Sequence, residues 1–133
     1  MPVPGLLLKI IQMFNTGDTS DADQVFSAEY ADHQQPAGLN LTGPEEFRAI
    51  VNLARHAMPS LSVTIRDASM AAGTHHDTAT ARLLWESQAG TRETIEILNI
   101  RNGLVTQHWG MEIHETDARR EKDEPGNQGT VGR

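Results

Sequence analysis

Cysteine is absent from the 133 residues of this sequence, which excludes disulfide bonds, thiolate metal ligands and a cysteine nucleophile. Long apolar runs are absent as well: none approaches the ~18 residues of a membrane span, and the stretch that starts at Leu6 is broken by Lys9. The same break argues against the apolar core of a signal peptide. We therefore expect a cytoplasmic protein with no membrane partner.

Basic side chains are few relative to acidic ones. The chain has 11 Lys and Arg against 18 Asp and Glu, which gives a net charge of −7. This charge repels phosphate backbones and anionic lipid headgroups, so we expect no nucleic-acid partner.

Sequence motifs of nucleotide, metal and acyl-enzyme chemistry are missing too. The glycines form neither a Walker loop nor a dinucleotide-binding fingerprint, and no Gly-x-Ser-x-Gly elbow occurs. None of the six histidines has His-Glu-x-x-His spacing. We expect no metal and no bound cofactor.

The first part of the chain has helical periodicity. Apolar residues recur every three to four positions from Leu7 to Phe14, and Gly17 is suited to close this helix in the left-handed conformation. Short polar residues at 18–21 then precede a brief helix with Val25 and Phe26 on its apolar side. Residues 30–41 are too polar and too broken for a packed helix and are interpreted as a loop or an edge strand.

A third helix is predicted between residues 42 and 59. Thr42-Gly43-Pro44-Glu45 has the spacing of a capping box, with Thr42 or Gly43 at the cap, and Pro59 stops the helix. After Pro59 the apolar period changes to two, which is typical of strands. Residues 93–101 and 104–114 flank Asn102-Gly103, a pair suited to a two-residue hairpin turn.

These elements predict an α+β fold in one domain, residues 1–114. Three N-terminal helices pack on one face of a curved sheet of four antiparallel strands and leave a cavity. Residues 115–133 are charged and rich in Gly, and we expect them to form a disordered tail.

The hairpin turn predicts which residues share a face of the sheet. With Asn102-Gly103 as the turn, Glu96 faces Trp109 and Leu98 faces Gln107, whereas His108 points to the other side. A carboxylate between two isoleucines is costly to bury unpaired. Glu96 therefore either pairs with Arg82 or Arg92 at the sheet surface or lies beside a cavity as an acid or base.

Other candidate residues have both a structural and a functional interpretation. His33 is either a simple loop residue or a hydrogen-bonding group at the rim of a pocket, and His108 is either a half-buried strand residue or part of the site. Trp85 and Trp109 are either core residues or a platform for a ligand.

Four segments in a fixed order carry a resemblance to a known family. They are residues 13–17 (MFNTG), 30–33 (YADH), 43–47 (GPEEF) and 100–109 (IRNGLVTQHW). In these segments the chain resembles the SnoaL-like polyketide cyclases, over about residues 6–113. The family is similar in fold to nuclear transport factor 2, which implies a cone-shaped α+β barrel with a deep pocket closed by helices.

The resemblance also implies a chemistry. A base removes a proton next to a carbonyl of a flat polycyclic aromatic polyketide, without a cofactor, and the enolate closes a ring by intramolecular aldol addition. Relatives in anthracycline-type antibiotic pathways act as hydroxylases instead. The cyclases carry an aspartate acid/base two positions after the histidine that corresponds to His108, and this position is Gly110 here. Glu96 is the nearest replacement, and a β-bulge near Trp109 would turn His108 inward.

The leading hypothesis is therefore a polyketide cyclase with Glu96 as the base and with His33 or His108 orienting the substrate carbonyl. The residues expected to contact the substrate are Tyr30, Phe47, Trp85, Leu98, Gln107 and Trp109. Hydroxylation on the same scaffold and non-catalytic ligand binding are the alternatives. We also expect a homo-oligomer, a dimer in the simplest case, formed through the outer face of the sheet.

Overall fold

The computed structural model describes residues 4–113 as helices and strands in one continuous arrangement. The predicted tail at 115–133 lies outside the described residues. The elements in chain order are α1 (Gly5–Thr16), α2 (Ala22–Val25), β1 (Phe26–Asp32), α3 (Pro44–Ala57), β2 (Ser62–Ala71), β3 (Asp77–Ser87), β4 (Gly90–Arg101) and β5 (Leu104–Ile113).

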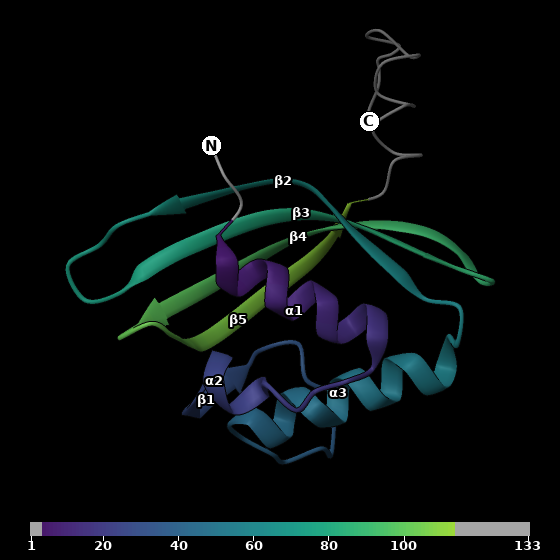
Figure 1. Cartoon of the computed structure of the whole chain (residues 1–133), viewed down its shortest axis with the longest axis horizontal. Helices are drawn as coiled ribbons and strands as arrows, with labels where there is room; N and C mark the ends of the chain where they lie inside the picture. Colours follow the sequence, from purple (N-terminus) through teal and green to yellow (C-terminus); the bar gives the residue numbers. More distant parts are fainter. Residues whose placement is uncertain (1–3, 114–133) are drawn as a thin grey trace, which may run out of the picture.

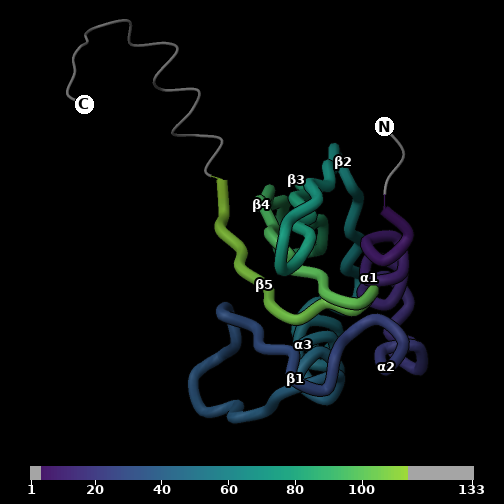
Figure 2. Tube along the Cα trace, turned by 90° about the vertical axis from the view of Figure 1, so that its left-hand side faces the viewer, coloured from purple at the N-terminus to yellow at the C-terminus, as the bar shows by residue number. Residues whose placement is uncertain are grey.

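The predicted α+β class is confirmed, with one more strand than the sequence pattern indicated. The sheet has five strands in the order β1-β5-β4-β3-β2, and β1 runs parallel to β5 while the other pairs are antiparallel. Figure 1 shows α1 lying across one face of the curved sheet, with α3 farther from it. In the perpendicular view, β5 bends away from β4 toward β1 and α3 (Figure 2).

The helix ends follow from local residues. Gly17 ends α1 in the left-handed conformation, with φ 79°, and its N–H donates to the carbonyl of Met13. Gly43, not Thr42, is the N-cap of α3, and no side chain caps that helix. A Cβ on Gly43 would lie 2.8 Å from the carbonyl oxygen of Ala28, so only glycine fits this close approach of backbone to backbone.

Aromatic side chains fill the space between the helices and the sheet. Phe14 of α1 lies edge-on to Phe47 and to Trp85, with ring centroids 5.5 and 5.2 Å apart, and Phe26 stacks on Phe47 at 4.3 Å. Asn15 joins α1 to β2, because its side-chain amide both donates to and accepts from the backbone of Val63. These contacts hold the helices over one face of the sheet.

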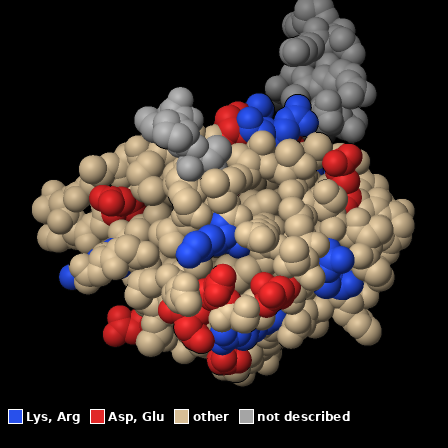
Figure 3. All heavy atoms as spheres, in the orientation of Figure 1, with Lys and Arg blue, Asp and Glu red and all other residues tan. Residues whose placement is uncertain are grey.

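The molecular surface carries charges of both signs. On the face shown in Figure 3, Lys and Arg side chains are scattered among acidic ones. One such network joins Arg48 to Asp23 and Glu45. Association through the outer face of the sheet stays a prediction. Among the described residues, no helix combines the length and apolar character needed to cross a membrane.

Candidate active site

A β-bulge in β5 decides which side chains face the helices. The hairpin starts as predicted, with Arg101 opposite Leu104, but the register shifts at Ile100, so that Glu96 lies opposite Gly110 and Leu98 opposite His108. The predicted pairing of Glu96 with Trp109 is therefore wrong, because β5 contains one extra residue that a simple count from the turn omits. His108 consequently shares a face with Glu96. This is the inward orientation that the family resemblance led us to expect from a β-bulge.

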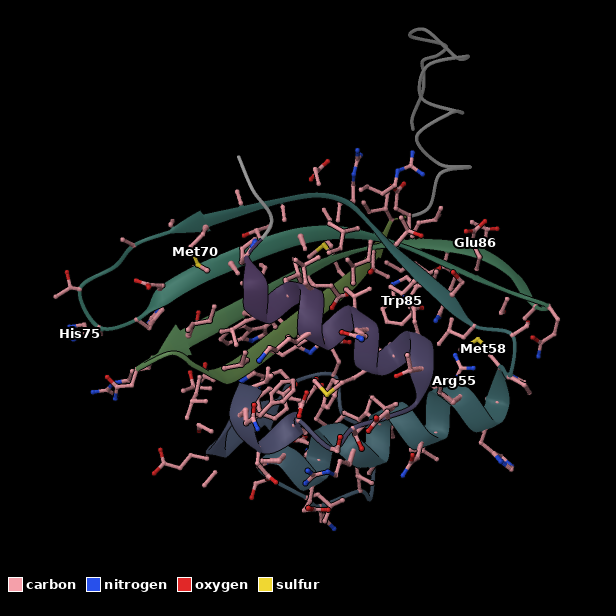
Figure 4. The ribbon with its side chains drawn as sticks, in the orientation of Figure 1. Arg55, Met58, Met70, His75, Trp85 and Glu86 are labelled. Atoms are coloured by element: carbon pink, nitrogen blue, oxygen red, sulfur yellow. The ribbon has the colours of Figure 1, made fainter. Side chains whose placement is uncertain are left out.

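This face of the sheet forms one wall of a cavity of about 330 Å³ between the sheet and the helices. The predicted residues that line it are Tyr30, Phe47, Trp85, Leu98, Glu96 and His108. Trp85 projects from β3 toward the C-terminal end of α3, where Met58 also lines the cavity (Figure 4). Most of the other lining residues are apolar, and the polar ones are Asp32, Gln34, Arg92, Thr94 and Glu112.

His108 lies between two carboxylates on that wall. Its Nε2 atom forms a hydrogen bond with Glu96 Oε1, and its Nδ1 atom lies 3.0 Å from Asp32 Oδ1. The side chains of His108, Glu96 and Asp32 are 18%, 12% and 6% exposed. Tyr30 donates its hydroxyl proton to Asp32 Oδ2 at 3.0 Å. Four titratable side chains therefore form a continuous chain of contacts, Tyr30 to Asp32 to His108 to Glu96.

The pairing of β1 with β5 brings Asp32 to His108. Asp32 lies beside His108 in the parallel ladder, and the N–H of His33 donates to the carbonyl of His108 at 2.9 Å. Asp32 is the last residue of β1, where the chain leaves the sheet, and its Oδ1 accepts the N–H of Gln34 at 2.8 Å. The carboxylate thus also closes the turn that follows the strand.

The charges of this cluster reinforce one another. Burial disfavours a charged imidazole, but the carboxylates of Asp32 and Glu96 outweigh it and raise the pKa of His108 to about 9. Burial also opposes ionisation of Asp32, yet its contacts with His108 and with the N–H of Gln34 hold the pKa of Asp32 below its ordinary value. Burial and the adjacent Asp32 charge raise the pKa of Tyr30 beyond its usual range. At neutral pH the site therefore contains an imidazolium, the carboxylate of Asp32 and a neutral phenol.

A fully buried carboxylate, Glu46, supports the end of β1 from behind. Its Oε1 atom accepts the backbone N–H of Asp32 at 3.1 Å, and its Oε2 atom accepts a hydrogen bond from Gln35 Nε2. Burial raises the pKa of Glu46, and the hydrogen bond from Asp32 N–H partly offsets this. Because Glu46 is in the first turn of α3, this helix is tied directly to the segment that carries Asp32.

Three of the predicted site residues lie elsewhere. His33 stacks on Trp109, with ring centroids 4.7 Å apart and an angle of 9° between the rings, and neither lines the cavity. Gln107 lies opposite Asn99 and is likewise absent from the cavity wall. The bulge accounts for Gln107 and Trp109, because it reverses the faces of β5 relative to a regular hairpin.

The surface ion pair considered for Glu96 does not form. Arg82 pairs with Asp67 at 3.1 Å and with Glu93 at 3.5 Å, and Arg92 lies 3.8 Å from Glu112. Glu96 instead has His108 as its partner. This distribution leaves Glu96 on the cavity side of β4.

Asp32 and Glu46 are the residues that sequence reasoning missed. Period-two spacing places Asp32 on the same side of a strand as Tyr30, but residues 30–41 lack the pattern of a regular strand, so this signal carries little weight. Glu46 precedes Phe47 in the apolar stripe of α3, which places a carboxylate at the edge of a buried face. Within residues 4–113, no group of three or more acidic or histidine side chains is arranged to hold a metal ion.

Comparison with known proteins identifies the family of this chain. The family model described as SnoaL-like polyketide cyclase matches residues 6–112. A candidate polyketide cyclase from Bacillus cereus is 22% identical, with a TM-score of 0.67 over 80% of this chain and 71% of that chain. No match was found among curated protein sequences.

Two further solved structures share the fold. TsrD from Streptomyces laurentii is 19% identical, with a TM-score of 0.60 over 90% of this chain and 96% of that chain. IdmH from Streptomyces antibioticus, a candidate polyketide cyclase, is 12% identical, with a TM-score of 0.59 over 88% and 96% of the two chains. With the family model spanning most of its length, this chain belongs to the SnoaL-like polyketide cyclase family.

Proposed function

We propose that this protein is a cyclase that enolises a polycyclic aromatic polyketide and closes a ring by intramolecular aldol addition. The observation that carries the proposal is the carboxylate of Glu96, held against the imidazole of His108 on the wall of an otherwise mostly apolar cavity. A solvent-exposed carboxylate is hydrated and has no fixed orientation. The Glu96 carboxylate is instead held at the cavity wall by its hydrogen bond, so it is oriented toward a substrate in the cavity.

In the first step, Glu96 removes the proton from a carbon next to a substrate carbonyl. The electrons of the broken C–H bond form the enolate, whose negative charge is stabilised by the imidazolium of His108 nearby. The enolate carbon then bonds to a second carbonyl carbon of the same molecule, and the new alkoxide takes back the proton from Glu96. Substrate and product are isomers, so the step consumes no oxidant and returns Glu96 to its starting state.

The other cavity residues have a binding role in this proposal. Tyr30, Phe47, Trp85 and Leu98 offer apolar and aromatic surface suited to flat rings. The cavity volume of about 330 Å³ lies at the lower end of the ~300–1,000 Å³ of small-molecule sites. A polycyclic substrate therefore fits with its reacting ring inside and another part near the mouth.

Hydroxylation and simple binding are the competing functions, and the products separate them. Ring closure leaves the mass of the substrate unchanged, hydroxylation adds the mass of one oxygen atom, and a binding module returns the ligand unaltered. A binding module also gains little from a carboxylate and an imidazolium desolvated together, because such pairs often stabilise a fold no better than apolar residues do. The pair beside the cavity therefore favours catalysis.

The test is Glu96→Gln, which keeps the shape of the side chain but removes the basic carboxylate. With an anthraquinone that carries two ketones positioned for ring closure, we expect the single-turnover rate to fall about 10²–10⁴-fold, while substrate affinity changes little. The matched control is Glu93→Gln, because Glu93 is on the same strand and pairs with Arg82 outside the cavity. A normal rate for Glu96→Gln would show that Glu96 is not the base.

A further inference from the structure

Gly110 lies directly opposite Glu96 in the ladder between β4 and β5. The carboxylate of Glu96 rests over this glycine. A Cβ atom at position 110 would lie 2.6 Å from Glu96 Oε1, 3.2 Å from Cδ and 3.4 Å from Oε2. A Cβ atom cannot make a hydrogen bond and does not approach an oxygen to 2.6 Å without a clash, so any larger residue at this position competes with the carboxylate for space.

The backbone gives no reason for glycine at this position. Gly110 is within β5 and its φ is outside the left-handed region, whereas Gly103 in the adjacent turn has φ 79°. A glycine inside a strand weakens it, because the unfolded chain has more freedom to lose and no side chain packs. Glycine at this position is therefore explained by the space above it, which holds the Glu96 carboxylate, and not by its backbone conformation.

We propose that Gly110 is a positioning residue for Glu96: its lack of a side chain provides the space in which the Glu96 carboxylate reaches Nε2 of His108. This inference deepens the proposed function, since it concerns the residue that holds the proposed base in place. Gly110 itself need not touch the substrate.

The contact pattern predicts how a larger residue would act. The atoms nearest to a new Cβ belong to the end of the Glu96 side chain, which rotates more easily than backbone moves. Gly110→Ala should therefore leave the sheet intact and push the carboxylate away from His108. His108 keeps its contact with Asp32 at 3.0 Å, so it loses one of its two partners.

The pKa of His108 reports this change without any substrate. The titratable groups around the imidazole are Asp32 and Tyr30 of β1, Glu46 of α3 and Glu96 of β4. Among these groups, Glu96 is the one that supplies the three atoms nearest to a Cβ at position 110. We expect the pKa of His108, measured by NMR titration of its ring signals, to fall by about one unit or more in Gly110→Ala.

The matched control is Gly5→Ala. A Cβ on Gly5 would have no neighbouring atom within 4 Å, and the φ of Gly5 is not left-handed, so the same substitution leaves the site untouched. The pKa of His108 should stay at the wild-type value in this variant. An unchanged pKa of His108 in Gly110→Ala would overturn the proposal.

A second pair of variants keeps the test decisive if Gly110→Ala does not fold. In the Glu96→Ala background the carboxylate is gone, so adding Gly110→Ala should not lower the melting midpoint and should leave the pKa of His108 unchanged. Folding of the double variant where Gly110→Ala alone fails supports crowding by Glu96. Failure of both variants would show that Gly110 serves the fold, and an additional fall of the His108 pKa in the double variant would show an effect independent of Glu96; either result overturns the proposal.

This test separates the positioning role from the proposed reaction. The pKa of His108 reports whether Gly110 controls the place of Glu96, whereas the turnover of Glu96→Gln reports whether Glu96 is the base. A lowered pKa in Gly110→Ala together with normal turnover in Glu96→Gln would support the positioning contact and refute the cyclase mechanism.

Discussion

Asp32→Asn tests how the charge cluster controls stability. The substitution keeps the size of the side chain and removes the negative charge 3.0 Å from His108 Nδ1. The group whose titration matters is His108, whose pKa of about 9 in the folded protein lies above the ordinary value of 6.5. Because the folded state binds this proton more tightly, the stabilisation is fully present below about pH 6.5 and is lost as the pH rises through about 9.

The magnitude follows from the size of the pKa difference. One pKa unit corresponds to about 1.4 kcal/mol, so the raised pKa of His108 corresponds to a pH-dependent stabilisation on the order of 3 kcal/mol. Removing one opposite charge at this distance lowers a pKa by about 1–3 units. In Asp32→Asn we therefore expect the free energy of unfolding near pH 7 to fall by about 1–3 kcal/mol.

Above about pH 9 the difference in stability between the wild type and Asp32→Asn should shrink or reverse. There His108 is neutral in the wild-type protein, and Asp32 becomes a buried charge without its cation. The asparagine variant avoids this cost, so the two stability curves should converge or cross as the pH rises.

The assay is urea denaturation at a series of pH values from 6 to about 10, with NMR titration of His108 on the same samples. The matched control is Asp67→Asn, because Asp67 pairs with Arg82 at 3.1 Å and an arginine stays charged throughout this range. Its stability curve should run parallel to that of the wild type. If Asp32→Asn also gives a parallel curve, the raised pKa of His108 does not arise from Asp32 and the reasoning is refuted.

Two further predictions concern the cavity lining and the contact between α1 and β2. Trp85→Ala should weaken binding of a flat aromatic ligand more than Trp109→Ala, because Trp85 lines the cavity and Trp109 stacks on His33 outside it; fluorescence titration measures both affinities, and a larger loss for Trp109→Ala would contradict the cavity assignment. Asn15→Ala should lower the free energy of unfolding by about 1–3 kcal/mol, since it leaves the backbone N–H and C=O of Val63 without their partners. Urea denaturation checks this value, and an unchanged midpoint would show that water replaces the amide.

Much of the fold could be predicted because its signals are local. The apolar stripe and Gly17 define α1, the change of period at Pro59 separates helix from strands, and Asn102-Gly103 marks the β4–β5 hairpin. The edge strand β1 is harder to predict from the sequence, because its pairing with β5 depends on residues far away in the sequence. Its polar, half-exposed pattern carries little information without that partner.

The candidate site could be predicted only in part for the same reason. Glu96 stands out in the sequence because a carboxylate between two isoleucines conflicts with burial in a sheet. The face of His108 depends on the bulge in β5, opposite Asn99 and Ile100, which no count of alternating residues indicates. No local sequence pattern indicates the role of Asp32, because this role depends on its contact with His108 in the neighbouring strand.

The parallel pairing of β1 with β5 has a consequence for the order in which the molecule forms. Strands β2 to β5 follow one another and pair with their neighbours in sequence, so this meander can assemble from contacts between adjacent segments. The β1–β5 ladder joins two strands that are separated in the sequence by α3 and by strands β2 to β4, so it forms only after this large loop has closed. We therefore expect Asp32 to reach His108 late in folding, and β1 with the first turn of α3 to detach early on denaturation while the meander persists. On heating, the contact between Asp32 and His108 would be lost before the sheet unfolds. We therefore expect inactivation at a lower temperature than unfolding of strands β2 to β5. Substitutions that strengthen the β1–β5 pairing should raise the temperature of inactivation.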